Sequence, residues 1–164
     1  MKLKTRARYA LRSMIEIARA THVDQPVSLE RVARRTGISR RYLEQLTRCL
    51  RETELVISIR GRSGGYLLAR SAEDIKVGQI VEAVIGPINI VDCVMRPEQC
   101  LIADVCECRE IYKAINERVL QAMNDYSLAQ LALRSKSQDP LPPLGEPDQM
   151  AAQSAQCNSL CSSR

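Results

Sequence analysis

The segment from residue 93 to residue 108 contains four cysteines, Cys93, Cys100, Cys106 and Cys108, within sixteen positions. Their spacing is C-x6-C-x5-C-x-C, and thiolate sulfur is a preferred ligand of zinc and of iron-sulfur clusters. Zinc ribbons and fingers usually carry two C-x2-C pairs, which this segment lacks. The spacing therefore favours an iron-sulfur cluster over zinc. A metal-free thiol switch and ordinary buried cysteines stay open as alternatives.

The last two of these cysteines set a condition on the local structure. Residues two apart on a regular helix point about 200° away from each other. Cys106 and Cys108 can therefore both bind one cluster only if Cys106 lies in a loop and the next helix begins at or after Cys108. The remaining cysteines lie elsewhere. Cys49 is predicted to be buried in the core. Cys157 and Cys161 are expected to be exposed thiols of the tail, an interpretation that we prefer to a second metal site.

The chemistry of these thiols depends on the compartment. The N-terminal stretch MKLKTRARY is charged, and no apolar block of signal-peptide length follows it. No apolar run reaches the roughly 18 residues needed to span a bilayer. We therefore expect a cytoplasmic protein, in which clustered thiols stay reduced. The odd total of seven cysteines also disfavours a fully paired disulfide framework.

The elements that must position these groups begin with three helices in the N-terminal half. Residues 5–20 predict an amphipathic helix. The stretch SLERVARRTG predicts a short helix between a Ser28 cap and a Gly37 stop, and SRRYLEQLTRCLRE predicts a third helix with Ser39 as N-cap. The apolar stripe of the third helix is expected at Leu43, Leu46 and Leu50.

The third helix has a polar outer face, and a hairpin follows it. At about 100° per residue, Arg41, Gln45 and Arg48 lie opposite the apolar stripe. Two short β runs, LVISIR and YLLAR, are joined by the glycine-rich loop GRSGG. Helix, helix-turn-helix and hairpin in this order predict a winged helix. Its outer helix would enter a DNA major groove, and Arg60 and Arg62 of the wing would contact phosphates or a narrow minor groove.

Charge divides the chain into two unlike parts. Residues 1–70 hold 16 Lys and Arg against 6 Asp and Glu, a net charge of +10, whereas residues 71–164 have a net charge of −5. A basic part joined to an acidic part indicates that the first binds a polyanion such as DNA. We predict a winged helix-turn-helix DNA-binding domain at 1–70, a cluster-binding loop and dimerisation helix at 71–134, and a disordered tail at 135–164.

Helical periodicity in the second part predicts a dimer. The stretch VGQIVEAVIG predicts a short helix that packs against the winged domain. The stretch REIYKAINERVLQAMNDY predicts a helix of about five turns, and SLAQLAL predicts a final short helix. One small domain cannot cover the broad apolar arc of the long helix, so we expect two copies to pair, matching a palindromic operator. The predicted fold class is mainly α with a small β-hairpin wing. The apolar arc comprises Ile111, Tyr112, Ile115, Val119, Leu120, Ala122 and Met123.

Together these motifs resemble those of the bacterial iron-sulfur winged-helix regulators of the IscR, NsrR and RirA type. The resemblance runs from the N-terminus to about residue 133 and rests on RYALRSMIEIA, GISRRYLEQL, LVISIRGRSGGYLLAR and the cysteine loop. It implies a homodimer that binds palindromic promoter DNA and holds a [2Fe-2S] or [4Fe-4S] cluster through three cysteines. The residues it implies are Cys93, Cys100 and Cys106 as ligands, Ser39, Arg41, Tyr42, Glu44 and Gln45 on the recognition helix, and Arg60 on the wing.

The fourth cluster ligand is where this sequence departs from that resemblance. The IscR type has a histidine three residues after the last cysteine, and a second subtype has an acidic residue near the N-terminus of the partner subunit. The corresponding positions here are Arg109 and Arg8, neither of which can ligate. Cys108 is the nearest substitute, with Glu107, Glu110, a solvent molecule or a small thiol behind it.

The sequence therefore predicts a homodimeric transcription regulator, interpreted as a repressor, whose cluster senses iron, redox state or nitric oxide and sets operator affinity. The alternatives are a winged-helix regulator controlled by bare thiols or by a partner protein, and an iron-sulfur electron carrier. An enzyme is not expected, since the single histidine, His22, has no nucleophile or paired acid around it. The candidates are Arg41 and Gln45 for base contacts, and Arg40, Arg48, Arg60 and Arg62 for phosphate or minor-groove contacts.

Overall fold

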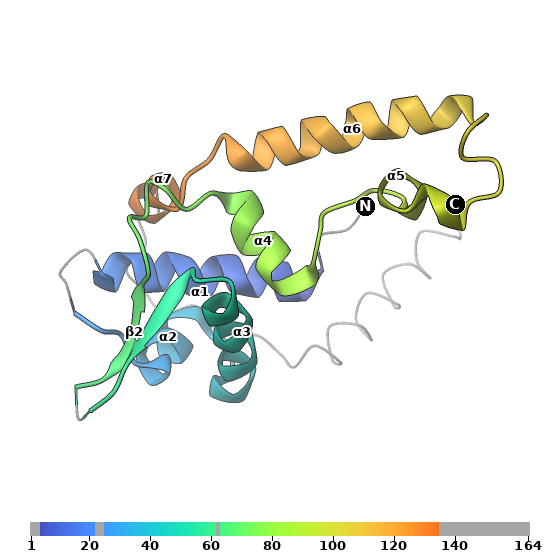
Figure 1. Ribbon diagram of the computed structural model, residues 1–164. Helices are drawn as coiled ribbons and strands as arrows, with labels where there is room; N and C mark the ends of the chain where they lie inside the picture. The colour runs from blue at the N-terminus through green and yellow to red at the C-terminus, as the bar shows by residue number, and fades with distance from the viewer. Residues whose placement is uncertain (1–3, 22–24, 62, 135–164) are drawn as a thin grey trace, which may run out of the picture.

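The computed structural model of the chain describes residues 4–21, 25–61 and 63–134. Helix α1 runs across the middle of the molecule, with α2, α3 and the hairpin on one side and α4, α6 and α7 on the other (Figure 1). The predicted fold class, mainly helical with a two-stranded antiparallel wing, is confirmed. The elements are α1 (Thr5–Thr21), α2 (Leu29–Thr36), α3 (Arg40–Glu52), β1 (Val56–Ile59), β2 (Gly65–Leu68), α4 (Val77–Ile85), α5 (Asp92–Met95), the 3-10 turn η1 (Pro97–Gln99), α6 (Glu107–Asn124) and α7 (Leu128–Arg134).

Helices α2 and α3 form the predicted helix-turn-helix. The Ser28 side chain caps α2 by accepting a hydrogen bond from the main-chain N–H of Arg31 at 3.3 Å. Gly37 ends the helix at a φ of 70°, a left-handed conformation that costs glycine little. Ser39 is the N-cap of α3 as predicted, although its side chain makes no capping hydrogen bond. The predicted apolar stripe of α3 is buried: Leu43, Leu46 and Leu50.

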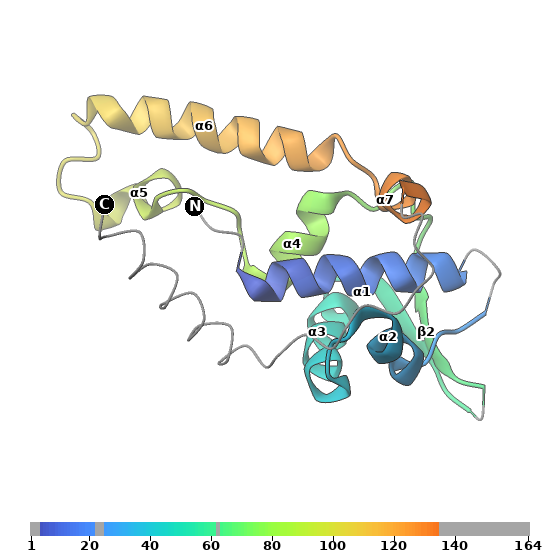
Figure 2. The same cartoon turned by 180° about the vertical axis from the view of Figure 1, so that it is seen from behind.

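One hydrophobic core lies around α1. Met14 and Ile17 of α1 are fully buried and belong to the same cluster as Leu43 of α3, Ile80 of α4 and Leu128 of α7. Helix α4 crosses between α1 and α6, as the view from behind also shows (Figure 2). The core therefore includes side chains from both sides of residue 70. The division of the chain into two domains at this residue stays a prediction.

The wing is attached to the helix-turn-helix through the main chain. β1 and β2 pair in antiparallel register, with Val56 opposite Leu68. Val27, which precedes α2, forms an additional bridge with Tyr66, and each main-chain N–H donates to the other carbonyl at 2.9 Å. A Cβ atom at Gly65 would lie 2.5 Å from the Val27 carbonyl oxygen. This position therefore requires glycine, because two backbones approach closely here.

Gly65→Ala is expected to lower the free energy of unfolding by about 1–3 kcal/mol, because the added methyl group must push Val27 away and weaken its two hydrogen bonds with Tyr66. Urea unfolding followed by circular dichroism measures the change. Ser58→Ala, at an exposed position of β1, is the matched control and should leave the midpoint nearly unchanged. Equal midpoints for both variants would contradict this account of the wing attachment.

Helix α6 is packed along only part of its length. Its one buried side chain is Asn116, at 4 % exposure, whereas Ile111 and Ile115 are 61 % and 43 % exposed. Near its C-terminal end, Val119 and Met123 pack against the core of the same chain. The predicted apolar arc is therefore divided between a C-terminal half that packs on the core and an N-terminal half in which Ile111 and Ile115 stay largely exposed.

Several predictions fall on residues whose structure is not described: Arg62, His22, and the tail at 135–164 with Cys157 and Cys161. Among the helices that are described, none is long and apolar enough to cross a membrane.

Candidate DNA-binding surface and cysteine loop

The outer face of α3 presents the predicted polar side chains to solvent, but they are not equivalent. Arg40 is held by Glu44, with 3.2 Å between Nε and Oε1, and its Nη1 lies 3.8 Å from Oε2 of Glu30. Arg48 Nε lies 3.0 Å from Oε1 of Glu52. Such exposed pairs contribute at most about 1 kcal/mol, so these arginines can exchange their carboxylates for DNA phosphates. The exposed predicted residues of this face are Ser39, Arg40, Arg41, Glu44, Gln45 and Arg48.

Arg41 and Gln45 differ from these paired arginines. Within the described part of the chain, neither side chain forms a hydrogen bond or an ion pair. Arg41 also lies in the N-terminal half of α3, the part of a recognition helix that meets base edges. The structure therefore leaves free the two side chains that were predicted to contact bases. On the wing, Arg60 is exposed directly after β1.

Tyr42 has a structural contact in addition to its predicted role at DNA. Its ring packs edge-on against Tyr9 of α1, with 5.7 Å between ring centroids and an interplanar angle of 85°. Burial raises the pKa of Tyr42, with a smaller opposing effect of Arg6, so the phenol stays protonated at neutral pH. Cys49 of the same helix packs against the core, as predicted, and its sulfur accepts a hydrogen bond from Arg6 Nη2 at 3.0 Å.

The four clustered cysteines lie between α4 and the first turn of α6. Cys93 belongs to α5, Cys100 directly follows η1, and Cys106 is the N-cap of α6 with a non-helical φ of −83° and ψ of 104°. These three thiols are partly buried, whereas Cys108 is exposed. Cys106 thus lies in the loop, but α6 begins at Glu107, one residue before the position that both thiols would need to face one cluster.

The metal-ligating side chains of this loop are spread apart. In the part of the chain that the structure describes, no three His, Cys, Asp or Glu side chains lie close enough together to hold one metal ion. The loop is therefore not a preformed tetrahedral zinc site. Cys93, Cys100 and Cys106 do supply the soft thiolate donors that an iron-sulfur cluster uses, but the loop would have to close for these three sulfurs to reach one cluster.

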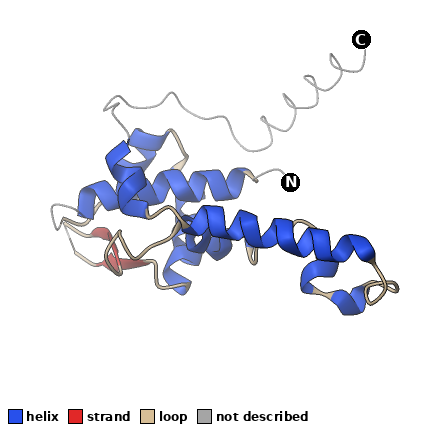
Figure 3. Ribbon diagram, turned by 90° about the horizontal axis from the view of Figure 1, so that it is seen from above, coloured by secondary structure: helices blue, strands red, loops and turns tan. Residues whose placement is uncertain are grey.

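The loop is fastened to α6 by two hydrogen bonds that sequence reasoning missed. The main-chain N–H of Ile90 donates to Oδ1 of Asn116 at 3.1 Å, and Arg109 Nε donates to the carbonyl oxygen of Cys93 at 3.2 Å. At the far end of the loop Leu101 and Val105 are exposed. Figure 3 shows α5 and this loop at the outer end of α6, away from the winged domain. No periodicity predicts these contacts, because each joins a side chain to irregular backbone.

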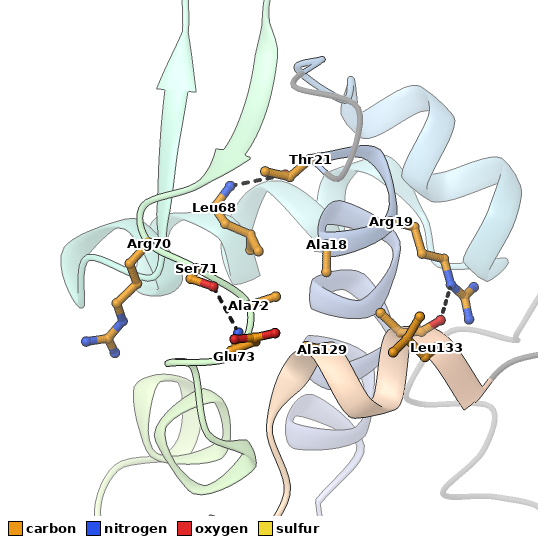
Figure 4. A pocket seen from close by; sticks show the side chains of 11 residues that line it. Ala18, Arg19, Thr21, Leu68, Arg70, Ser71, Ala72, Glu73, Ala129 and Leu133 are labelled. Atoms are coloured by element: carbon orange, nitrogen blue, oxygen red, sulfur yellow. Dashed lines mark hydrogen bonds between the residues drawn. The ribbon is translucent and has the colours of Figure 1, made fainter.

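A separate hollow of about 520 Å³ lies where the C-terminal end of α1 meets β2 and α7 (Figure 4). Its wall includes the apolar side chains of Ala18, Leu68 and Ala129. Arg19 stands at its edge and donates from Nε to the Ala132 carbonyl oxygen at 3.3 Å, while its buried Nη2 has no partner among the described residues. The hollow contains no grouping of nucleophiles or metal ligands, and we assign it no part in the candidate site.

The winged-helix architecture and the cysteine loop correspond to a known family. The model of the Rrf2 family, described as an iron-dependent transcriptional regulator, matches residues 3–134. The chain belongs to the Rrf2 family. It is therefore a DNA-binding transcription regulator, and not an enzyme. The suspected resemblance to winged-helix regulators is confirmed at the level of this family.

Individual Rrf2 relatives match over most of their length. Protein rrf2 of Nitratidesulfovibrio vulgaris (strain Hildenborough) is 40 % identical over 131 residues, which cover 80 % of this chain and 87 % of that protein. The HTH-type transcriptional regulator IscR of Erwinia tasmaniensis is 37 % identical over 131 residues, which cover 80 % and 78 % of the two chains. Among solved structures, CymR, the global cysteine regulator of B. subtilis, is 35 % identical with a TM-score of 0.70, covering 83 % of this chain and 99 % of its own.

Proposed function

We propose that this Rrf2 protein is a cytoplasmic homodimeric repressor whose affinity for operator DNA is set by an iron-sulfur cluster on Cys93, Cys100 and Cys106. The observation that carries the proposal is the placement of three partly buried thiols on the segment from α5 to the N-cap of α6. The exposed apolar half of this helix is the candidate surface for pairing two copies. A homodimer fits a regulator that recognises a palindromic operator.

The fold offers a physical route from the loop to the DNA. The loop is hydrogen-bonded to α6, α6 packs on α4, and α4 packs on both α1 and α3. A change in the loop can therefore alter the tilt of α6 and, through α4, the position of the recognition helix. In a dimer paired through α6, a small tilt changes the separation of the two α3 helices, which must match half-sites about 34 Å apart. A bound cluster would supply sensitivity to iron, redox state or nitric oxide.

The identity of the fourth ligand is narrowed by the neighbours of Cys106. Glu110 forms an ion pair with Lys113. The hydrogen bond and the charge of Lys113 lower the pKa of Glu110, and the carboxylate would have to leave this exposed ion pair before it could bind a cluster. Cys108 is exposed and has no such partner among the described residues. Cys108 stays the first candidate, with Glu107, Glu110 or an exchangeable solvent or small-thiol ligand behind it. Because α6 begins at Glu107, ligation by Cys108 together with Cys106 requires the first turn of α6 to unwind.

Anaerobic reconstitution of the full chain with iron and sulfide tests the proposal. The wild-type protein is expected to become brown, with visible charge-transfer absorption and several equivalents of iron and sulfide per chain. Cys106→Ala should lose this absorption, whereas Cys49→Ala, which changes a thiol away from the loop, should keep it. An operator selected from random duplex DNA should bind the loaded and cluster-free proteins with affinities that differ about 5- to 150-fold. A colourless wild-type protein without sulfide contradicts the cofactor assignment.

A second candidate is a regulator controlled by the bare thiols. It is favoured by the absence, within the described residues, of three side chains gathered around one metal position. In that case the protein stays colourless, and operator affinity changes when the thiols are oxidised. The alternative of another class, an iron-sulfur electron carrier, is not supported, because the chain belongs to a family of transcription regulators.

A further inference from the structure

Arg109 lies three residues after Cys106, in the first turn of α6, and its side chain contacts the cysteine loop. Its Nε donates to the carbonyl oxygen of Cys93 at 3.2 Å, and its main-chain N–H donates to the carbonyl oxygen of Cys106 at 3.1 Å. The main-chain bond belongs to the first turn of α6 and would remain with any residue at this position, so the contribution of the side chain is its link to Cys93. We propose that Arg109 is a positioning residue that holds the Cys93 segment against the first turn of α6, which follows Cys106, before any cofactor binds. Its relevance to a cluster rests on the proposed function.

The contact of Arg109 is one of a pair that sets the register of the loop against α6. Asn116 lies seven positions after Arg109, so that both residues lie on one face of the helix, about 10 Å apart along its axis. Asn116 is almost fully buried and accepts the Ile90 N–H at 3.1 Å. The segment from Ile90 to Cys93 is thereby attached to α6 at two points. With the Arg109 side chain removed, only the attachment at Ile90 remains of these two, and Cys93 can move away from α6.

The environment of Arg109 distinguishes it from an ordinary surface arginine. It is partly buried, while its neighbours Cys108 and Glu110 are exposed. It also lies in the first turn of α6, where the helix dipole disfavours positive charge. Arg118, on the same helix, is exposed and forms no hydrogen bond or ion pair with any described residue. The hydrogen bond from Arg109 to the Cys93 carbonyl oxygen offsets the unfavourable electrostatic energy of a cation at this end of the helix.

The test compares Arg109→Ala with Arg109→Lys and with the matched control Arg118→Ala, all as the full cluster-free chain. Alkylation of Cys93 by iodoacetamide is followed by mass spectrometry, together with amide hydrogen exchange in the peptide that contains Ile90 and Cys93. Arg109→Ala is expected to raise both rates several-fold, because opening at Cys93 becomes easier. Arg118→Ala should match the wild type. Arg109→Lys should fall between them, because lysine keeps a donor but not the planar guanidinium.

A second measurement connects this role to the cofactor. In reconstituted protein, Arg109→Ala should lose its visible absorption to a chelator about tenfold faster than Arg118→Ala, the scale of effect seen when a group that orients a metal ligand is removed. Equal alkylation and exchange rates in Arg109→Ala and Arg118→Ala overturn the positioning role, whether or not a cluster binds. Altered alkylation with unchanged cluster loss overturns its relevance to the cluster. A wild-type chain that takes up no sulfide contradicts the proposed function alone, and the alkylation rates still decide the role of Arg109.

Discussion

Arg41→Ala is expected to weaken binding to the selected operator by about 5- to 160-fold, which corresponds to the roughly 1–3 kcal/mol carried by a bidentate contact between arginine and guanine. Arg41 is exposed on the face of α3 opposite the buried leucines, and no described residue holds its guanidinium. It can therefore enter a major groove without first breaking an internal ion pair. Fluorescence anisotropy with labelled operator at one fixed salt concentration measures the change.

The control for this variant is Arg51→Ala, which removes the same charge from the last turn of α3, at the end away from the proposed base contacts. It should weaken binding only modestly and equally for all DNA sequences, as expected for long-range attraction to phosphates. Arg41→Ala should in addition reduce the ratio between the affinity for operator DNA and the affinity for random DNA. An equal loss in both variants, with unchanged sequence preference, would show that Arg41 does not contact bases. Unfolding midpoints should stay close to the wild type, because both positions are exposed.

Leu46→Ala is expected to lower the free energy of unfolding by about 2.7–5 kcal/mol, the range for leucines removed from well-packed cores. Leu46 is 1 % exposed and lies between Leu43 and Leu50 on the buried stripe of α3. Its loss leaves a cavity beneath the recognition helix that the surrounding helices cannot close without moving. Urea denaturation followed by circular dichroism measures the change.

Leu133→Ala is the matched control, since it removes the same atoms from a side chain that is 78 % exposed. It should change the free energy of unfolding by at most about 0.5 kcal/mol. A similar, small loss at Leu46 would contradict the packing of α3 against α1. Leu46→Ala should also weaken operator binding, because α3 loses the support that holds its outer face in place.

The sequence contained enough local information to predict the winged helix. Ser28 and Gly37 bracket α2 through contacts within a few residues, and the leucines of α3 recur at helical spacing, so both signals are short-range and regular. The hairpin followed from two β runs around a glycine-rich loop. The bridge between Val27 and Tyr66 could not be predicted in this way, because it joins residues far apart in the chain and depends on backbone geometry alone.

The candidate site was predicted in its residue types but not in its arrangement. The spacing of Cys93, Cys100 and Cys106 identified a loop that carries three thiols. Sequence spacing cannot predict how close their sulfur atoms lie in space. Arg109 was recognised from the sequence only as a residue unable to ligate, since a hydrogen bond from a side chain to irregular backbone leaves no periodic signal. The division of the α6 apolar arc was also hidden, because it depends on where α4 crosses the helix.

The bridge between Val27 and Tyr66 has a consequence for the order in which the protein acquires its shape during synthesis. Helices α2 and α3 leave the ribosome before β2, so the complete recognition helix exists before the strand that fixes the wing beside it. Domains generally fold from the N-terminal side as the chain emerges, but contacts distant in sequence must wait for their second partner. A nascent chain that ends before Tyr66 therefore carries the base-reading candidates of α3 while the wing is still unattached to Val27. The complete DNA-binding surface, wing included, exists only once β2 has been made.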